Sequence, residues 1–554
     1  MRISTKQICT IAAVASFVFG SFFSNKIAEA PITVSVIKEA EKLSGLTFSA
    51  PQEDSMQTGL REHLKAYQEL QKLGVKNSIV PALNFNPVPV GFVYPDKTDG
   101  FLLNKNSIAQ MPANKNELAF YSIRQLADLI RTKHISSVEL TKFFLDRLKK
   151  FNPKLLAVVS FTDDLALKQA EKADQEIAAG HYRGVLHGIP FAVKDLLSAK
   201  NYKTTFGAAP YQDQQFDADA TVVKKLEDAG AVLIAKLSLG ELAMDDTWFG
   251  GRTNNPWDLT RGSGGSSAGP GAAVSAGCVP FAIGSETWGS IVEPSNNCGD
   301  TGLRPSFGRV SKYGAMALSW SMDKLGPMAR TVEDCAIVFN AIQGKDPNDL
   351  STISAPFKYD ENVKSLKGWK IGYLKTDFQS KYPNQHNDSL TLVKMKELGA
   401  TLIPIELPKL PFNSMNFILD AEAGAAFQEL ILTHRSDLLK RQEKAAWPNI
   451  FRTAQFISAV EYIQANRART LLIQNWYEKL KGLDLYLSPS YSDNLLMTNL
   501  TGNPCVVLPN GFTAKGLPTS ITFMGQLFGE GKTLEAARIY QQATDFNTKH
   551  PQLF

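Results

Sequence analysis

The 554-residue chain is poor in cysteine, histidine and clustered charge, and each shortage excludes a class of protein. Its five cysteines are too few and too scattered for a disulfide framework, and none belongs to a CxxC or Cys/His pattern typical of zinc. The seven histidines are equally scattered. The net charge of +5 comes from 59 basic and 54 acidic residues spread along the chain, without the clustered Lys and Arg of a nucleic-acid-binding surface. We therefore expect no metal site and no nucleic-acid partner.

Several familiar active-site and cofactor motifs are also missing or incomplete. The "GKT" of residues 531–533 lacks the glycine that a P-loop has five residues before its G-K, because Gln526 stands there, and "GPGAAV" lacks the third glycine of a dinucleotide fingerprint, so no nucleotide cofactor is expected. "GSSAG" fits the G-x-S-x-G of α/β-hydrolases with Ser267 as nucleophile, but it needs an Asp and then a His downstream. Only His386, His434 and His550 follow, in ordinary surroundings. "SMDK" and "SDN" resemble penicillin-recognising enzymes, but no K-T-G follows them.

Long hydrophobic runs are absent except near the N-terminus. Arg2 and Lys6 precede an uncharged run of 16 residues from Ile8 to Phe23, and Ala28-Glu29-Ala30 has the form of a cleavage site. A charged start, an apolar centre and a small-residue site together predict a secretory signal peptide over residues 1–30. An uncleaved N-terminal anchor is the alternative. We expect an exported protein, periplasmic or secreted, with no stable membrane insertion once the signal is removed.

The order of apolar segments predicts an α/β fold. Residues 31–115 form an N-terminal extension that begins with two helical patterns and continues as a Pro-rich, extended stretch. A helical tract follows from Ser122, and from "LAVVSF" onward short apolar runs alternate with helical stretches. Such alternation is typical of a large β-sheet with helices on both faces. At this length one large or two medium domains are expected, and without a low-complexity linker we predict one large catalytic domain.

One segment combines many glycines with no charge. Residues 262–285 contain no charged residue, and residues 262–289 contain eight glycines. A buried Gly/Ser-rich segment can present backbone N–H groups to an anion or oxyanion, or it can be a helix that packs closely on a sheet. The segment alone leaves both interpretations open.

Without a suitable histidine, lysine is the base that remains for serine chemistry. A serine hydroxyl needs a base to become a nucleophile, and burial can hold a lysine in its neutral form. Lys194 follows the apolar strand candidate of "HGIPFAVKDLL". The alternative is a surface lysine at a strand end, paired with Asp195.

Two of these segments resemble the amidase signature family. They are "GIPFAVKD" and "GSGGSSAGPGAAVSAGCVPFAIGSETWGSIVEPSNNCGDTGLRPSFGRVS", and the likeness extends before them and to "TGNPCVVLPNGF" and "GLPTSITFMG" after them. It covers residues 116–545, is loose over about residues 345–450 and excludes the extension. The resemblance implies a catalytic domain over 116–545, a mixed β-sheet flanked by helices on both faces, and hydrolysis of a carbon–nitrogen amide bond in a small-molecule substrate without a cofactor.

The resemblance also implies a Ser–cis-Ser–Lys triad. Ser290 would be the nucleophile, Ser266 the bridging serine after a cis peptide bond, and Lys194 the base. The oxyanion hole would be the backbone N–H groups of Thr287, Trp288, Gly289 and Ser290.

Three positions near Ser290 depart from the family pattern. Trp288 stands where a glycine is usual, and it would be strained if that position needed a positive φ. Its indole would instead line the acyl pocket. Glu286 replaces an aspartate and Val292 an arginine that usually pair to support the loop, which suggests a rebuilt support. The triad positions are intact, so we predict an active amidase. The alternatives are an amidotransferase A-type subunit that releases ammonia from glutamine, and a non-catalytic amidase-like binding protein.

Overall fold

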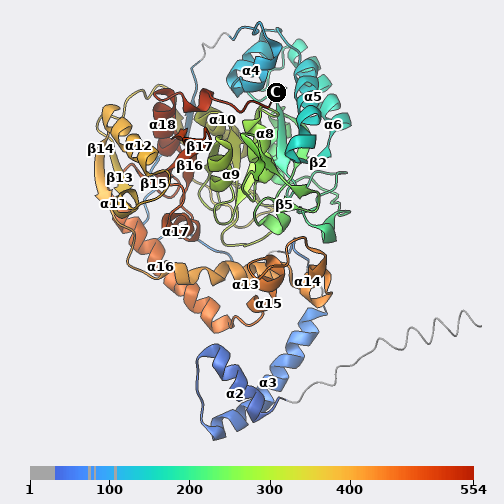
Figure 1. Cartoon of the computed structure of the whole chain (residues 1–554), viewed down its shortest axis with the longest axis vertical. Helices are drawn as coiled ribbons and strands as arrows, with labels where there is room; N and C mark the ends of the chain where they lie inside the picture. Colours follow the sequence, from blue (N-terminus) through green and yellow to red (C-terminus); the bar gives the residue numbers. More distant parts are fainter. Residues whose placement is uncertain (1–31, 73–75, 80–82, 105–108, 554) are drawn as a thin grey trace, which may run out of the picture. The chain divides into compact units, whose positions relative to one another are not determined.

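The computed structural model describes residues 32–72, 76–79, 83–104 and 109–553 (Figure 1). The chain divides into two compact units, residues 1–75 and 76–554. The predicted signal peptide, residues 1–30, lies outside the described residues.

The described part of the first unit contains two helices, α2 (Val34–Ser44) and α3 (Ala50–Gln71). Helix α2 begins after Thr33, whose hydroxyl accepts from the N–H of Val36, and ends at Gly45 in a left-handed conformation. The side chain of Gln52 accepts from the N–H of Ser49 at 2.8 Å, which stabilises the start of α3. These helices agree with the helical patterns at the start of the predicted extension.

The second unit is built on a mixed sheet, 11-stranded within the described residues, in the order β14-β13-β15-β17-β16-β10-β11-β9-β3-β4-β2 (Figure 1). The pairs β13/β14, β13/β15, β3/β4 and β3/β9 are parallel and the others antiparallel. The strands are β2 (Val158–Phe161), β3 (Pro190–Lys194), β4 (Val232–Leu237), β9 (Phe281–Glu286), β10 (Thr301–Arg304), β11 (Lys324–Ala329), β13 (Lys370–Leu374), β14 (Thr401–Ile405), β15 (Leu485–Pro489), β16 (Cys505–Phe512) and β17 (Pro518–Gly525).

The helices of this unit surround the sheet, with short strand pairs and 3-10 turns between them. The helices are α4 (Ile123–Arg131), α5 (Ser137–Leu155), α6 (Asp163–Ala178), α7 (Thr221–Asp228), α8 (Ala268–Ser275), α9 (Val292–Cys298), α10 (Val332–Ile342), α11 (Lys375–Gln379), α12 (Gln385–Glu397), α13 (Phe417–Ala426), α14 (Gln428–Leu432), α15 (Trp447–Ala454), α16 (Ala459–Leu480), α17 (Asp493–Thr501) and α18 (Glu530–Gln542). The short strands are β1 (Gly100–Leu102) with β12 (Lys358–Asp360), β5 (Thr247–Trp248) with β6 (Gly251–Arg252), and β7 (Asn254–Asn255) with β8 (Asp258–Gly262). The 3-10 turns are η1 (Lys115–Phe120), η2 (Ala209–Tyr211), η3 (Glu241–Ala243), η4 (Phe412–Met415), η5 (Arg435–Leu438) and η6 (Phe546–Thr548).

Two neighbouring residues of β10 show that helices cover both faces of the sheet. The Thr301 hydroxyl accepts from the Gln541 side chain of α18 at 3.0 Å. At Gly302, a Cβ would lie 2.7 Å from Ser295 Oγ of α9. Because successive residues of a strand point to opposite faces, α18 and α9 lie on opposite sides of the sheet. The predicted α/β fold with helices on both faces is confirmed.

The short apolar runs of the sequence all appear as strands of this sheet, and tertiary pairing adds β10, β11 and β17, which alternation did not identify. The helical tract from Ser122 is two helices, α4 and α5. The break follows from the sequence around Ser136, whose hydroxyl accepts from the N–H of Glu139 while the Glu139 carboxylate accepts from the N–H of Ser136. This capping box starts a new helix.

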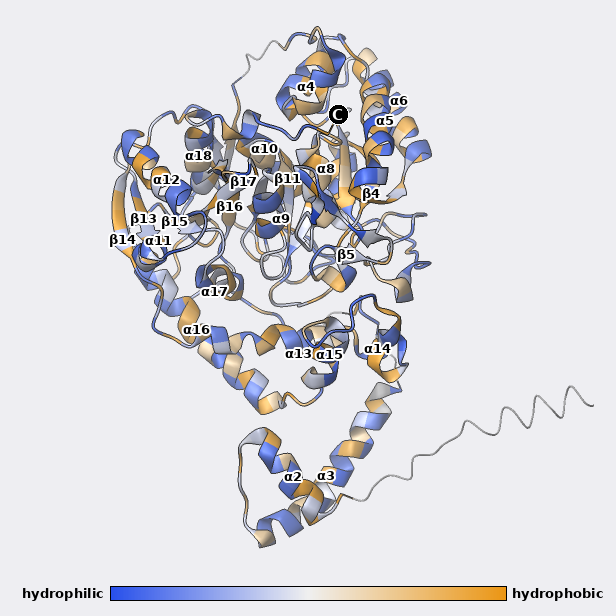
Figure 2. Cartoon of the chain, in the orientation of Figure 1, coloured by the Kyte–Doolittle hydropathy of each residue, from blue (hydrophilic) through white to orange (hydrophobic). Residues whose placement is uncertain are grey.

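Hydropathy follows the layers of the fold (Figure 2). The outer helices alternate hydrophilic and hydrophobic residues along their length, whereas β3, β4 and β9 are buried at every position. In the part of the chain that the structure describes, no helix combines the length and the hydrophobicity needed to cross a membrane.

Candidate functional site

Lys194 lies at the carboxyl end of β3, between β9 and β4 of the sheet. Its side chain is fully buried. Strand β9 runs parallel to β3 and pairs with it through Ala282 and Ile283, so Ser285, near the end of β9, reaches the same edge of the sheet. Parallel strands place their carboxyl ends together, which is where sites of α/β sheets form.

Hydroxyl groups surround the Lys194 amine. Its Nζ lies 2.8 Å from Ser266 Oγ, 2.9 Å from Ser285 Oγ and 3.1 Å from Ser267 Oγ. No ion pair joins Lys194 to a carboxylate of any described residue. The geometry therefore brings together two members of the predicted triad, Lys194 and Ser266.

Burial lowers the pKa of Lys194 well below its usual range, and the more distant carboxylates of Asp323 and Glu286 offset this only in part. The neutral amine is thus favoured, with two N–H donors and one lone pair. A neutral lysine next to a hydroxyl can accept that hydroxyl's proton.

The hydroxyl of Ser267 is occupied on all sides. It donates to the carbonyl of Ser285 at 3.0 Å, accepts from the N–H of Ser285 at 3.1 Å and accepts from Lys194. A hydroxyl has one proton and two lone pairs, so Ser267 has no proton left for the amine. Ser266 and Ser285 are the neighbours that can exchange a proton with Lys194. The G-x-S-x-G interpretation of Ser267 gains no support from this geometry.

Ser266 follows a cis peptide bond from Gly265, as the resemblance implied. It lies two residues before α8, and this helix is buried at every residue. At Gly265, a Cβ would lie 1.7 Å from the carbonyl oxygen of Asp245. The uncharged segment is therefore both a closely packed helix and the support of Ser266, so its two interpretations are compatible.

Ser290 lies at the end of the segment 287–290 that follows β9. Its carbonyl accepts from the N–H of Ser267 at 3.1 Å, which joins the segment to the start of α8. The Ser290 hydroxyl forms no hydrogen bond with any other described residue. The hydrogen bond from Ser290 to Ser266 that the predicted triad needs is therefore not formed in this structure.

The backbone N–H groups of residues 287–290 donate to no other group of the described chain. Thr287, Gly289 and Ser290 are nonetheless buried. Because almost all buried N–H groups of folded proteins are paired, a run of unpaired ones calls for an explanation such as an anion or oxyanion.

Trp288 is accommodated without backbone strain. The positive φ of this turn, +87°, belongs to Gly289, and Trp288 is not among the described residues with positive φ. The Trp288 side chain is 44% exposed, so the indole is available to a ligand near Ser290.

Glu286 is the centre of the support behind this segment. One carboxylate oxygen accepts from the N–H groups of Ile291 and Val292 at 2.9 and 3.0 Å. The other accepts from Arg304 at 2.7 Å and from Asn499 at 2.8 Å. Burial alone would raise the pKa of Glu286, but the charge and hydrogen bond of Arg304 outweigh burial and lower it to about 2. Arg304 thus supplies the positive charge that the usual arginine at position 292 would bring. The support of this segment is therefore built from Glu286 and Arg304.

Asp195 pairs with a different lysine from the one considered in the sequence. Its carboxylate lies 2.8 Å from Lys236 Nζ, and both side chains are fully buried. Lys194 is therefore not a surface lysine paired with Asp195.

Sequence reasoning missed Ser285, Arg304, Asn499 and Asp323. Asp323 accepts from the Thr287 hydroxyl at 2.5 Å. These residues carry no motif of their own, and only their partners across the fold identify them. Of these four residues, only Ser285 could have been found from the sequence, because it lies inside the motif, one residue before Glu286.

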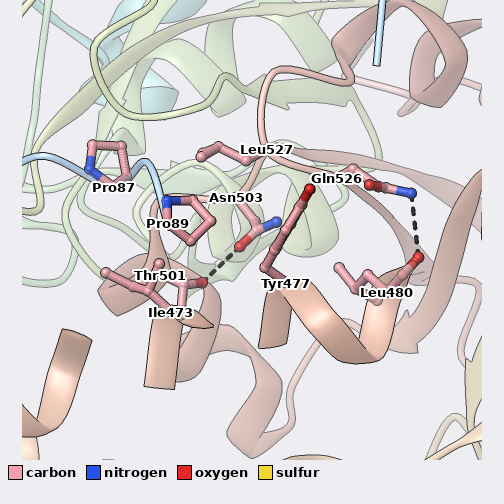
Figure 3. Close-up of a pocket in the computed structure, with 9 residues that line it drawn as sticks. All are labelled: Pro87, Pro89, Ile473, Tyr477, Leu480, Thr501, Asn503, Gln526 and Leu527. Carbon is pink, nitrogen blue, oxygen red and sulfur yellow. Dashed lines mark hydrogen bonds between the residues drawn. The ribbon is translucent and has the colours of Figure 1, made fainter. Parts of the chain in front are cut away.

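A small cavity lies elsewhere in this unit, beside α16 (Figure 3). Its volume is about 20 Å³, room for about one water molecule, so an organic substrate does not fit. It is lined by Pro87, Pro89, Ile473, Tyr477, Leu480, Thr501, Asn503, Gln526 and Leu527 and contains no member of the predicted triad. Among the described residues, no group of three or more His, Cys, Asp or Glu side chains could hold a metal ion.

The comparisons with known proteins show which family has this fold and this sequence. The sequence profile of the Amidase family matches residues 139–497. The chain is 35% identical over 481 residues to the A-type subunit of a glutamyl-tRNA(Gln) amidotransferase from Coxiella burnetii, covering 78% of this chain and 99% of the relative.

Solved structures give the same result. The native peptide amidase of Stenotrophomonas maltophilia is 30% identical with a TM-score of 0.69, covering 76% of this chain and 97% of that one. An amidase family protein of Bacillus anthracis is 27% identical with a TM-score of 0.71, covering 79% and 93%. The chain belongs to the amidase family, in agreement with the resemblance in its sequence.

Proposed function

We propose that the protein is a serine amidase that hydrolyses a carbon–nitrogen amide bond through an acyl-enzyme. The observation that carries the proposal is the buried amine of Lys194, which has no carboxylate partner among the described residues and lies 2.8 Å from Ser266. The unpaired N–H groups of residues 287–290 support it.

In the proposed reaction, Lys194 takes the proton of Ser266 as Ser266 takes the proton of Ser290. The Ser290 oxygen attacks the amide carbon, and the N–H groups of residues 287–290 hold the oxyanion. The protonated Lys194 returns the proton through Ser266 to the nitrogen, and the amine leaves. Water then attacks the acyl-enzyme with the same relay, which releases the acid and restores Ser290.

The first experiment is intact-mass analysis after treatment with a fluorophosphonate probe. We expect one adduct on the wild-type protein, none on Ser290→Ala and slower labelling of Lys194→Ala. Ser267→Ala is the matched control and should still be labelled. An adduct that survives Ser290→Ala would contradict the proposal, and an unlabelled wild type would favour a non-catalytic binding protein.

The amidotransferase A-type subunit is the second candidate, because the 35% identical relative has that name. Ammonia release distinguishes the two: a peptide amide should be the substrate of an amidase, and glutamine that of an amidotransferase subunit. Release from glutamine that rises with a co-purifying subunit would favour the second candidate.

We also propose that the protein is exported to the periplasm or secreted. The support is the charged start, the apolar run and the Ala28-Glu29-Ala30 site in the sequence. Intact mass of the protein from fractionated cells tests this: a chain that starts at Pro31 outside the cytoplasm is expected, and a full-length cytoplasmic chain would contradict it.

A further inference from the structure

A single carboxylate reaches the proposed oxyanion segment from the chain just before β11. The Thr287 hydroxyl donates to one oxygen of Asp323 at 2.5 Å. The other oxygen accepts from the N–H groups of Leu318 and Ser319 at 2.8 and 3.0 Å. Three hydrogen bonds fix the orientation of this buried carboxylate, so it holds Thr287 in one place.

The segment that carries Asp323 is itself held from α13. One oxygen of Glu422 accepts from the Ser319 hydroxyl at 2.7 Å and from the Ser321 N–H at 3.0 Å. Its other oxygen accepts from the hydroxyls of Ser321 and Tyr462, each at 2.7 Å.

Two further contacts hold the same segment. Arg469 of α16 donates to the hydroxyl and carbonyl of Ser321 at 2.8 and 2.9 Å. The Asn77 side chain donates to the carbonyl of Ala317 at 2.7 Å and accepts from its N–H at 2.9 Å. Asp323 is thus presented to Thr287 from a rigid support.

The proposed oxyanion segment needs such contacts because it has no backbone ladder of its own. Its N–H groups donate to no other described group. Gly289 has a positive φ, and because glycine has no side chain its backbone is freer to move than that of other residues. Glu286 holds the residues after Ser290, and Asp323 holds Thr287, so the two carboxylates clamp the segment at its two ends.

We propose that Asp323 is a positioning residue for the oxyanion hole: through the Thr287 hydroxyl it keeps the N–H groups of residues 287–290 aimed at the substrate oxygen. This inference rests on the proposed function. It concerns a residue that touches no substrate and acts through Thr287.

The test compares Asp323→Asn, Thr287→Val and Thr287→Ser in steady-state release of ammonia from a peptide amide. A misplaced oxyanion donor acts on the transition state, so kcat and kcat/KM should fall together by about 10- to 100-fold in Asp323→Asn and Thr287→Val, with KM unchanged. Thr287→Ser keeps the hydroxyl and should retain the wild-type kcat. The double variant should be no slower than Asp323→Asn, because both changes break one contact.

Asp388→Asn is the matched control, since Asp388 of α12 is a buried aspartate bonded to Tyr382 and Asn510. It should lower the thermal midpoint and leave kcat per labelled site unchanged. The final extent of fluorophosphonate labelling gives the folded fraction of each variant, so a folding loss is separated from a slower reaction.

A wild-type kcat in Asp323→Asn, or a raised KM with normal kcat, would overturn the inference. So would a Thr287→Ser variant as slow as Thr287→Val. Each of these results counts only if the variant is still labelled on Ser290 to the same final extent as the wild-type protein. Loss of that adduct would instead contradict the proposed function.

Discussion

Lys194 and Lys236 occupy buried ends of adjacent strands but have different surroundings. Lys236 lies 2.8 Å from Asp195, so its ammonium form is paired. Lys194 has only hydroxyls and a backbone carbonyl around its amine among the described residues. Burial lowers the pKa of both, and lowers that of Lys194 well below its usual range. The ion pair with Asp195 therefore marks Lys236 as a structural lysine, whereas the unpaired Lys194 is the candidate base.

The activity should depend on pH through Lys194. The relay needs the neutral amine, so kcat/KM should rise as pH rises through the lowered pKa of Lys194 and should level off before the ordinary lysine value of 10.5. A pH profile measures this. Lys194→Arg should be inactive at every pH, because arginine stays protonated. A profile that rises only near 10.5 would contradict a neutral lysine.

Glu286 should determine acid stability. Its pKa is about 2 in the folded protein against 4.5 ordinarily, so its stabilisation is present above pH 4.5 and is lost as pH falls from 4.5 towards 2. Glu286→Gln leaves the Arg304 charge buried without its partner and should lower the free energy of unfolding by about 3–5 kcal/mol. Urea unfolding at neutral pH measures this loss.

Glu478→Gln is the control for Glu286, because its ion pair with Lys481 is exposed. It should leave the urea midpoint unchanged. Equal midpoints for the two variants would show that the buried pair adds nothing.

Among the elements, helix α8 shows how glycine content serves the site. The helix is buried throughout, and Gly265 before it leaves no space for a side chain. Helix α3 also contains a glycine, Gly59, but there a Cβ would meet nothing within 4 Å. The same residue type therefore has opposite roles in the two elements.

Gly265→Ala and Gly59→Ala should differ accordingly. At Gly265 the Cβ would lie 1.7 Å from the Asp245 carbonyl, so the backbone before Ser266 must move and fluorophosphonate labelling of Ser290 should slow by about 100-fold. Gly59→Ala should stabilise α3 by about 0.5–1 kcal/mol and leave labelling unchanged. Labelling rates and thermal melts measure both. Normal labelling of Gly265→Ala would contradict the packing argument.

At the scale of the whole molecule, the core lies in one of the two units. Within the described residues, the large hydrophobic cluster runs from Leu118 to Leu553 and includes no residue of the first unit. Residues such as Phe101, Leu103 and Met111 pack against this cluster from the stretch before η1. The candidate site and all its described contacts fall within residues 76–554.

A chain that starts at Lys76 should therefore fold and react. We expect fluorophosphonate labelling of Ser290 at the full-length rate and a cooperative thermal transition. The matched comparison is a chain that starts at Lys115, which loses the residues that pack on the core and should have a lower thermal midpoint. An unlabelled or aggregated chain from Lys76 would show that the first unit is needed for the fold.

Much of this protein could be predicted from local sequence. The apolar runs predicted β2, β3, β4, β9, β13, β14, β15 and β16, because side-chain alternation and burial leave a pattern within a few residues. The motifs located Lys194, Ser266 and Ser290 because they recur as contiguous strings. The break before Ser136 was not predicted, although the capping box that causes it lies within four residues of sequence.

The sequence by itself determined the family, the α/β class and the candidate triad. Only the tertiary structure decided which charges pair: Asp195 with Lys236, and Glu286 with Arg304 and with Asn499, 213 residues away. It also decided that Gly289, and not Trp288, has the positive φ, and that Asp323 meets Thr287. The physical reason is that burial and charge pairing depend on neighbours brought together by the sheet, and these neighbours leave no periodic or contiguous trace along the chain.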